Sequence, residues 1–136
     1  MRRKSISVAA ALMLSGCAGS ELTSASEHIL TDESGKLVLE YRNVEIPLMV
    51  LIEMPGGQAM RPSGPPSSYT MSQVTDYWIG ATSEAMKRCG YVELRQQLKN
   101  KSHDRSAFAQ GENKLGGSVM VNCGKARRLA EAILSH

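Results

Sequence analysis

The chain has 136 residues, enough for one small domain, and a formal net charge of +3. Three of its sixteen basic residues lie at positions 2–4, so residues 17–136 carry thirteen basic and thirteen acidic side chains. Because basic and acidic side chains are equal in number over residues 17–136, the net charge gives no reason to expect binding to nucleic acid.

The first sixteen residues have the organisation of an export signal. Arg2, Arg3 and Lys4 precede an uncharged, mostly apolar stretch from Ser5 to Leu14. This stretch is too short to cross a bilayer but matches the apolar region of a secretory signal peptide. Leu14, Ser15, Gly16 and Cys17 follow, and this sequence resembles the lipobox of bacterial lipoproteins. The alternative is an ordinary secretory signal with a chance Cys.

The resemblance implies that residues 1–16 are a signal peptide. Leu14, Ser15 and Gly16 would be recognised by the signal peptidase, and Cys17 would become the first mature residue, carrying acyl chains such as palmitate. Two or three acyl chains on one residue attach a protein almost permanently, whereas a single chain binds only marginally. Ala18 rather than Asp follows Cys17, which resembles lipoproteins sorted to the outer membrane. We therefore expect a lipid-anchored protein on the periplasmic face of the outer membrane.

After Cys17, small and polar residues up to position 36 predict a flexible tether, followed by one globular domain over residues 37–136. Alternation of apolar and polar residues predicts a strand at Leu37–Tyr41 and a second strand at Val44–Met54. Pro47 marks the second strand as an edge strand or as the place where a strand starts.

A loop and a helix are expected next. Residues 55–68 contain four prolines and three glycines, which predicts a loop that is either functional or loosely ordered. Thr70 and Gln73 have capping-box spacing, and apolar residues then recur at helical spacing as far as Cys89. Gly90 is well placed to end this helix.

The C-terminal third is less distinct. Residues 91–99 fit either a helix or a short strand, and residues 100–117 are expected to be mostly loop. Ser118–Cys123 alternates like a strand, and Lys125–Ser135 has the apolar spacing of a closing helix. The expected fold class is α+β: a small single domain with a short, mainly antiparallel sheet and two main helices.

Cys17 is the predicted site of lipid attachment, which leaves Cys89 and Cys123 as a pair. Export would bring Cys89 and Cys123 into an oxidising compartment, where an even number of cysteines usually forms disulfides. Both lie on predicted apolar faces, so we expect them to bond. A buried pair of free thiols and a redox-active pair are the alternatives, although the sequence has no Cys-x-x-Cys.

No pattern reaches the strength of a catalytic or metal motif. Residues 111–118 have the outer spacing of a phosphate-binding loop, but Gly117 stands where that loop needs Lys. His103 and Asp104 are adjacent in a polar segment, where such pairs are more often solvated than catalytic. No histidine is paired at metal-ligand spacing; the three are His28, His103 and His136. We expect no enzyme, no metal and no small-molecule cofactor.

Three cations mark the start of the last predicted helix: Lys125, Arg127 and Arg128. The helix dipole disfavours cations there, but together with free backbone N–H groups they attract anions. The hypothesis is contact with a phosphate or an acidic partner, and the alternative is a solvated basic turn.

These features predict a lipid-anchored binding or structural module of the cell envelope. It would contact the membrane and an envelope protein, as an accessory subunit of an assembly, secretion or conjugation machine. One alternative is a protective lipoprotein that inhibits a lytic enzyme or excludes phage or plasmid, with residues 55–68 entering a cleft. A less favoured alternative is an enzyme acting on peptidoglycan or lipid through His103 and Asp104.

Overall fold

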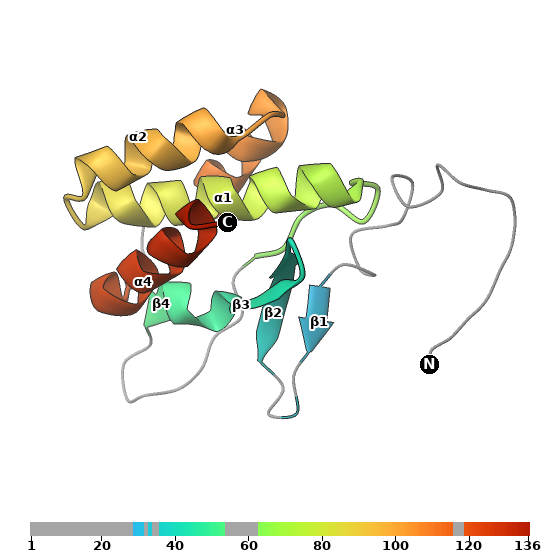
Figure 1. Ribbon diagram of the computed structural model, residues 1–136, viewed down its shortest axis with the longest axis horizontal. Coiled ribbons are helices and arrows are strands. Elements are labelled where there is room, and N and C mark those ends of the chain that lie inside the picture. The colour runs from blue at the N-terminus through green and yellow to red at the C-terminus, as the bar shows by residue number, and fades with distance from the viewer. Residues whose placement is uncertain (1–28, 32, 34–35, 54–62, 116–118) are drawn as a thin grey trace, which may run out of the picture.

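The computed structural model describes residues 29–31, 33, 36–53, 63–115 and 119–136, and they form an α+β domain (Figure 1). The helices are α1 (Met71–Arg88), α2 (Val92–Lys101), α3 (Arg105–Lys114) and α4 (Cys123–Leu134). The strands are β1 (Ile29–Thr31), β2 (Leu37–Tyr41), β3 (Val44–Pro47), β4 (Ile52–Glu53) and β5 (Met120–Val121). The predicted fold class is confirmed, and α1 and α4 are the two longest helices described.

A three-stranded antiparallel sheet has the order β1-β2-β3. Tyr41 pairs with Val44 across a two-residue turn, in which Arg42 (φ 50°) and Asn43 (φ 66°) both have positive φ. Positive φ at both central residues is typical of the hairpin turn that matches strand twist. At the other edge, Ile29 pairs with Leu39. Residues Ile29–Thr31, which lie within the range predicted as a tether, therefore belong to this sheet.

The single strand predicted for Val44–Met54 is wrong in its middle. After β3, Leu48–Leu51 form a 3-10 helix, η3, and β4 then pairs with β5 in a second small sheet. Leu48 and Leu51 are both buried. Residues three apart share a face of a 3-10 helix, so the turn directs both leucines into the core, which strand alternation would not do.

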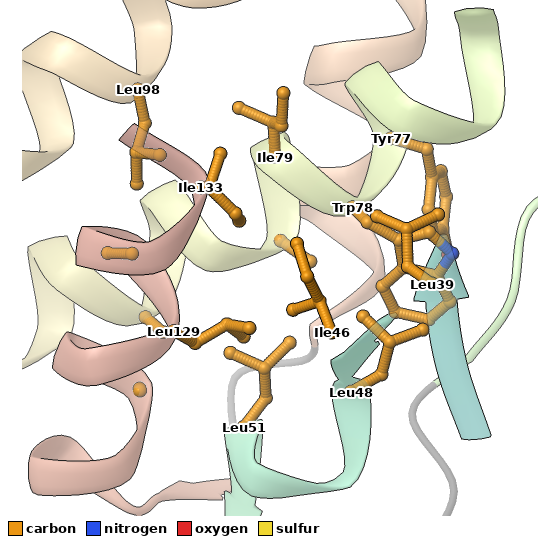
Figure 2. Close-up of a cluster of buried hydrophobic side chains, with 14 of the residues drawn as sticks. Leu39, Ile46, Leu48, Leu51, Tyr77, Trp78, Ile79, Leu98, Leu129 and Ile133 are labelled. Atoms are coloured by element: carbon orange, nitrogen blue, oxygen red, sulfur yellow. The ribbon is translucent and has the colours of Figure 1, made fainter. Parts of the chain in front are cut away.

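The core lies where the β2–β3 hairpin, η3 and α4 meet α1 (Figure 2). Figure 1 shows α2 and α3 on the other side of α1. Because α1 packs on several sides, it is buried almost all round between Val74 and Met86. The predicted apolar stripe of α1 is buried at Val74, Trp78, Ala81 and Ala85, each at most 3% exposed.

Residues 105–114 form α3 rather than the predicted loop. The helix packs against α1 so closely that the two backbones touch. A Cβ added at Gly111 would lie 1.8 Å from the carbonyl oxygen of Tyr77, and one at Gly80 would lie 2.1 Å from that of Phe108. Gly111 is therefore the residue of α3 that lets this helix approach α1 so closely.

Both ends of α1 match the sequence prediction. At its start, the side chain and backbone of Thr70 form the reciprocal capping box with Gln73. At its end, Gly90 (φ 82°) donates its N–H to the Lys87 carbonyl, and the next N–H bonds to the carbonyl of Met86. This pair of bonds is the Schellman motif, in which Gly supplies the left-handed residue.

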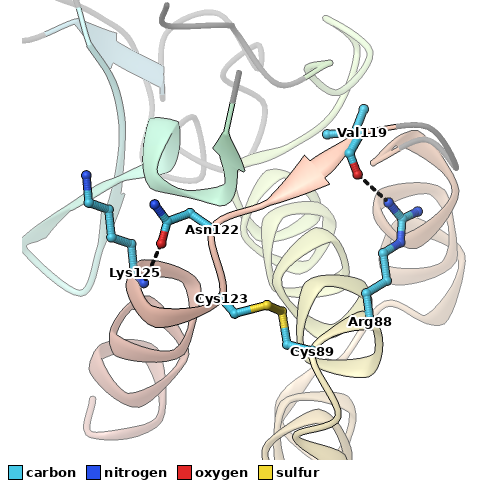
Figure 3. The surroundings of a disulfide bond; sticks show 6 residues. All are labelled: Arg88, Cys89, Val119, Asn122, Cys123 and Lys125. Atoms are coloured by element: carbon cyan, nitrogen blue, oxygen red, sulfur yellow. Dashed lines mark hydrogen bonds between the residues drawn. A yellow bond between two sulfur atoms is a disulfide. The ribbon is translucent and has the colours of Figure 1, made fainter. Parts of the chain in front are cut away.

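The predicted disulfide is confirmed: Cys89 and Cys123 are bonded, with Cα atoms 5.7 Å apart (Figure 3). Cys89 is the C-cap residue of α1. Cys123 is the first residue of α4 and not part of a strand, which corrects the predicted strand Ser118–Cys123. The helix begins early because the side chain of Asn122 caps it, accepting a hydrogen bond from the Lys125 backbone N–H at 3.2 Å.

Candidate functional site

The residues of the predicted lipobox, Leu14, Ser15, Gly16 and Cys17, lie outside the described residues. The other predicted contact site, the basic start of α4, is described in full. Its capping contact uses the backbone N–H of Lys125, and the amide Nδ2 of Asn122 donates to Glu53 at 3.4 Å. One of the N–H groups invoked for anion binding is thus already satisfied within the protein, with a carboxylate nearby.

The three cations of this segment do not converge. Arg127 forms an ion pair with Glu131 at 3.3 Å, and its guanidinium lies 5.4 Å from the centroid of the Tyr91 ring. Lys125 and Arg128 instead line a cavity shared with β3. A helix turns by about 100° per residue, so neighbouring positions on α4 serve different surfaces. The candidate anion site therefore includes Lys125 and Arg128 but not Arg127.

We call this cavity the β3–α4 groove. It has a volume of about 390 Å³ and is lined by all four residues of β3, by Lys36 and Val50, and by Lys125, Arg128, Leu129 and Ala132 of α4. Its apolar lining includes the partly buried Val44 and Val50. The groove therefore combines an apolar lining with charged groups at its margin.

Positive charge dominates the groove. Three of its lining residues are basic (Lys36, Lys125 and Arg128) and one is acidic, Glu45. All four are exposed. Within the described part of the chain, the side chains of Lys125 and Arg128 form no ion pair, and Glu45 forms none either. The groove can therefore attract an anion without first breaking an internal ion pair of Lys125 or Arg128.

The groove opens at the edge of the sheet. Successive side chains of a strand point to opposite faces, so a cavity lined by four consecutive residues of β3 lies along its edge. The order β1-β2-β3 leaves that edge without a strand partner in the described sheet. In a two-residue hairpin the pair flanking the turn, here Tyr41 and Val44, is hydrogen-bonded, and such pairs alternate along the ladder. The backbone groups of Glu45 and Pro47 accordingly point away from β2.

No family model, curated protein or solved structure matches the chain. None of the described helices is long and apolar enough to cross a membrane. Among the described residues, no group of three or more His, Cys, Asp or Glu side chains is placed to hold a metal ion.

A second cavity, of about 680 Å³, lies between the β2–β3 hairpin, α1 and the end of α2. It contains Asp76, a carboxylate that is only 2% exposed and that sequence analysis did not single out. Asp76 accepts the backbone N–H groups of His103 at 3.1 Å and Asp104 at 2.6 Å. Residues two apart on a helix point to nearly opposite sides, so the apolar stripe through Val74 and Trp78 gave no signal that Asp76 is buried. The carboxylate holds the segment between α2 and α3 in place.

Of the adjacent pair His103 and Asp104, the aspartate has a structural role. Asp104 caps α3 by accepting the Ala107 N–H at 3.0 Å, and its second oxygen accepts a hydrogen bond from the Gln73 amide at 3.3 Å. These two bonds, the Ala107 bond first, lower the pKa of Asp104 below its ordinary value. Both oxygens are thus engaged in holding the start of α3.

Proposed function

We propose that the protein is a lipid-anchored binding module of the cell envelope. Cys17 holds it to the membrane, and the globular domain presents the β3–α4 groove to another envelope protein. The observation that carries the proposal is the order of cations, apolar run and lipobox in residues 1–17. Ala18 after the acylated Cys favours the periplasmic face of the outer membrane.

The Cys89–Cys123 disulfide supports export of the domain. Disulfides persist in the periplasm and outside the cell, whereas cytosolic proteins are kept reduced. The groove supports binding rather than catalysis, because its charged groups are three cations and one carboxylate around an apolar lining. Such a lining can recognise an acidic surface.

Lipid anchoring is tested with the full chain carrying a C-terminal tag. We expect mass spectrometry of the purified protein to find Cys17 as the first residue with acyl chains attached, and the protein to partition into detergent. Cys17→Ser should abolish acylation and cleavage and leave the precursor at full length. Cys89→Ser/Cys123→Ser is the matched control, which removes the two disulfide-bonded cysteines but should be acylated normally.

An unmodified Cys17 in the wild-type protein, or cleavage at another bond, would overturn the anchoring proposal. The binding function is tested by crosslinking in intact cells and then identifying the captured proteins. Specific capture of envelope subunits supports the proposal. Capture of a lytic hydrolase supports the protective alternative, and the absence of any specific crosslink contradicts a binding module.

A further inference from the structure

We propose that the β3–α4 groove binds an extended, acidic segment of a partner protein, which adds to the edge of β3 as a fourth strand. The inference rests on the proposed binding function and specifies its ligand class and its mode of binding. It follows from three properties of the groove: a strand edge with no partner among the described strands, a neighbouring helix and an excess of positive charge.

The free edge supplies backbone hydrogen-bonding groups. By the alternation of the β2–β3 ladder, Glu45 directs both its N–H and its C=O away from β2, and Pro47 directs its C=O the same way. Pro47 has no N–H, so its place on this edge leaves no donor unsatisfied. An extended peptide can exchange two bonds with Glu45, which is the main-chain recognition of strand addition. Pro47 is the N-cap of η3, and its carbonyl accepts the first bond of that turn.

The helix beside the edge supplies side-chain contacts. Figure 1 shows β3 on the side of the sheet nearest α4, with β1 on the far side. Leu129 and Ala132 of α4 and Val50 after β3 line the cavity between them. Alternate side chains of an added strand would face this apolar lining, and the side chains between them would face solvent and the basic margin.

The charges select an acidic segment. Lys125 and Arg128 extend from α4 with no ion pair in the described part of the chain, and Lys36 adds a third cation to the margin. Glu45 is the single opposing carboxylate. Carboxylates at the margin of an added strand would pair with Lys125 and Arg128. A protein segment fits better than a lipid headgroup, because a headgroup would leave the aligned backbone groups of the β3 edge unused.

The test uses the mature lipidated protein in neutral detergent micelles, with a displayed library of random dodecapeptides as the probe. We expect selected peptides to be rich in Asp and Glu alternating with apolar residues. Their affinities are then measured individually on variants. Glu45→Pro removes the outward N–H without touching a bond to β2, whereas Glu45→Ala removes only the carboxylate.

Glu45→Pro should weaken binding about tenfold or more relative to Glu45→Ala, because it removes one edge bond and places a ring on the edge. Glu45→Ala should bind acidic peptides at least as well as wild type. Lys125→Glu/Arg128→Glu should abolish binding. The control Arg105→Glu/Lys114→Glu reverses the same number of charges at the two ends of α3, outside the groove, and should bind normally.

Folding of Glu45→Pro is checked by its thermal transition, and amide hydrogen exchange of the wild type is a second readout. Peptide binding should protect the Glu45 amide from exchange.

The inference is overturned if no acidic peptide is selected, if the Pro and Ala variants bind equally, or if the Glu45 amide gains no protection. It is also overturned if phosphatidylglycerol vesicles compete with peptides while phosphatidylcholine vesicles do not, which would assign the groove to anionic lipid. Each of these outcomes leaves the acylation and crosslinking results, and hence a lipid-anchored binding module, standing, and removes only the groove as its protein-binding surface.

Discussion

Gly80 and Gly111 determine how near α1 and α3 lie, because neither position has room for a methyl group. The atoms that a Cβ would meet belong to backbone, the Phe108 and Tyr77 carbonyls, and cannot rotate aside as a side chain would. Helix propensity favours Ala over Gly by about 1 kcal/mol in a helix interior. At these two positions a larger residue must push the helices apart, and the cost of doing so outweighs the higher helix propensity of Ala.

We therefore predict that Gly111→Ala lowers the free energy of unfolding by about 1–3 kcal/mol, the usual cost of overpacking a core. Gly64→Ala is the matched control, because a Cβ there would have no atom within 4 Å. Urea unfolding of the two variants measures the difference. Equal midpoints for Gly111→Ala and wild type would show that α1 and α3 are not in backbone contact.

Among the elements, α3 depends most on its cap. Its interior is polar, and its buried residues are few: Ala107, Phe108 and Gly111. The capping bonds made by Asp104 also tie it to α1 through Gln73. Because these bonds favour the ionised form, the pKa of Asp104 is lower in the folded protein than in the unfolded chain. Its contribution to stability is complete above the unfolded value and is lost as pH falls through the folded one.

Asp104→Ala should cost about 1 kcal/mol at neutral pH, as loss of a helix N-cap usually does. Asp104→Asn keeps a capping oxygen but has no proton to bind, so it should lose less stability than wild type as pH falls below 4, near the ordinary carboxyl value of 3.8. Denaturant unfolding at pH 7 and at pH 3 compares the three proteins. Identical acid sensitivity of wild type and the Asn variant would contradict this role.

The elements that local sequence specifies were predicted correctly, and those that depend on distant contacts were not. Helix α1 carries its own cap and its terminating Gly90, so both of its ends could be predicted. Helix α3 could not be, because Gly111 and a polar composition indicate a loop unless the opposing Gly80 is known. Likewise η3 forms because Leu48 and Leu51 meet a core built mostly from residues after position 70.

At the scale of the molecule, the disulfide joins the end of α1 to the start of α4 across a sequence separation of 34 residues. Closing a loop of this size stabilises a fold by about 4 kcal/mol on the chain-entropy model. Cys89→Ser/Cys123→Ser should therefore lower the melting temperature markedly, and treatment of wild type with a reductant should lower it equally. A melting temperature that neither change affects would contradict the prediction.

The two candidate sites differ in whether they can be found from the sequence alone. The proposed lipobox is contiguous, so Leu14 to Cys17 could be predicted as a site from the sequence alone. The β3–α4 groove joins Lys36 and residues 44–50 to residues 125–132, and no spacing in the sequence indicates that these segments meet. Sequence analysis identified Lys125 and Arg128 as basic residues of interest, but only the fold separates them from Arg127 and adds the strand edge.

The Cys89–Cys123 bond also makes a closed covalent ring that contains α2, α3 and β5. A protease that cuts one peptide bond inside this ring opens it but releases nothing, because the two pieces stay joined through sulfur. Cleavage before residue 89 or after residue 123 instead separates the chain at once. A nicked molecule would run as one band on a gel without reductant and as two bands with it, so part of this small domain can be cut once without the two pieces separating.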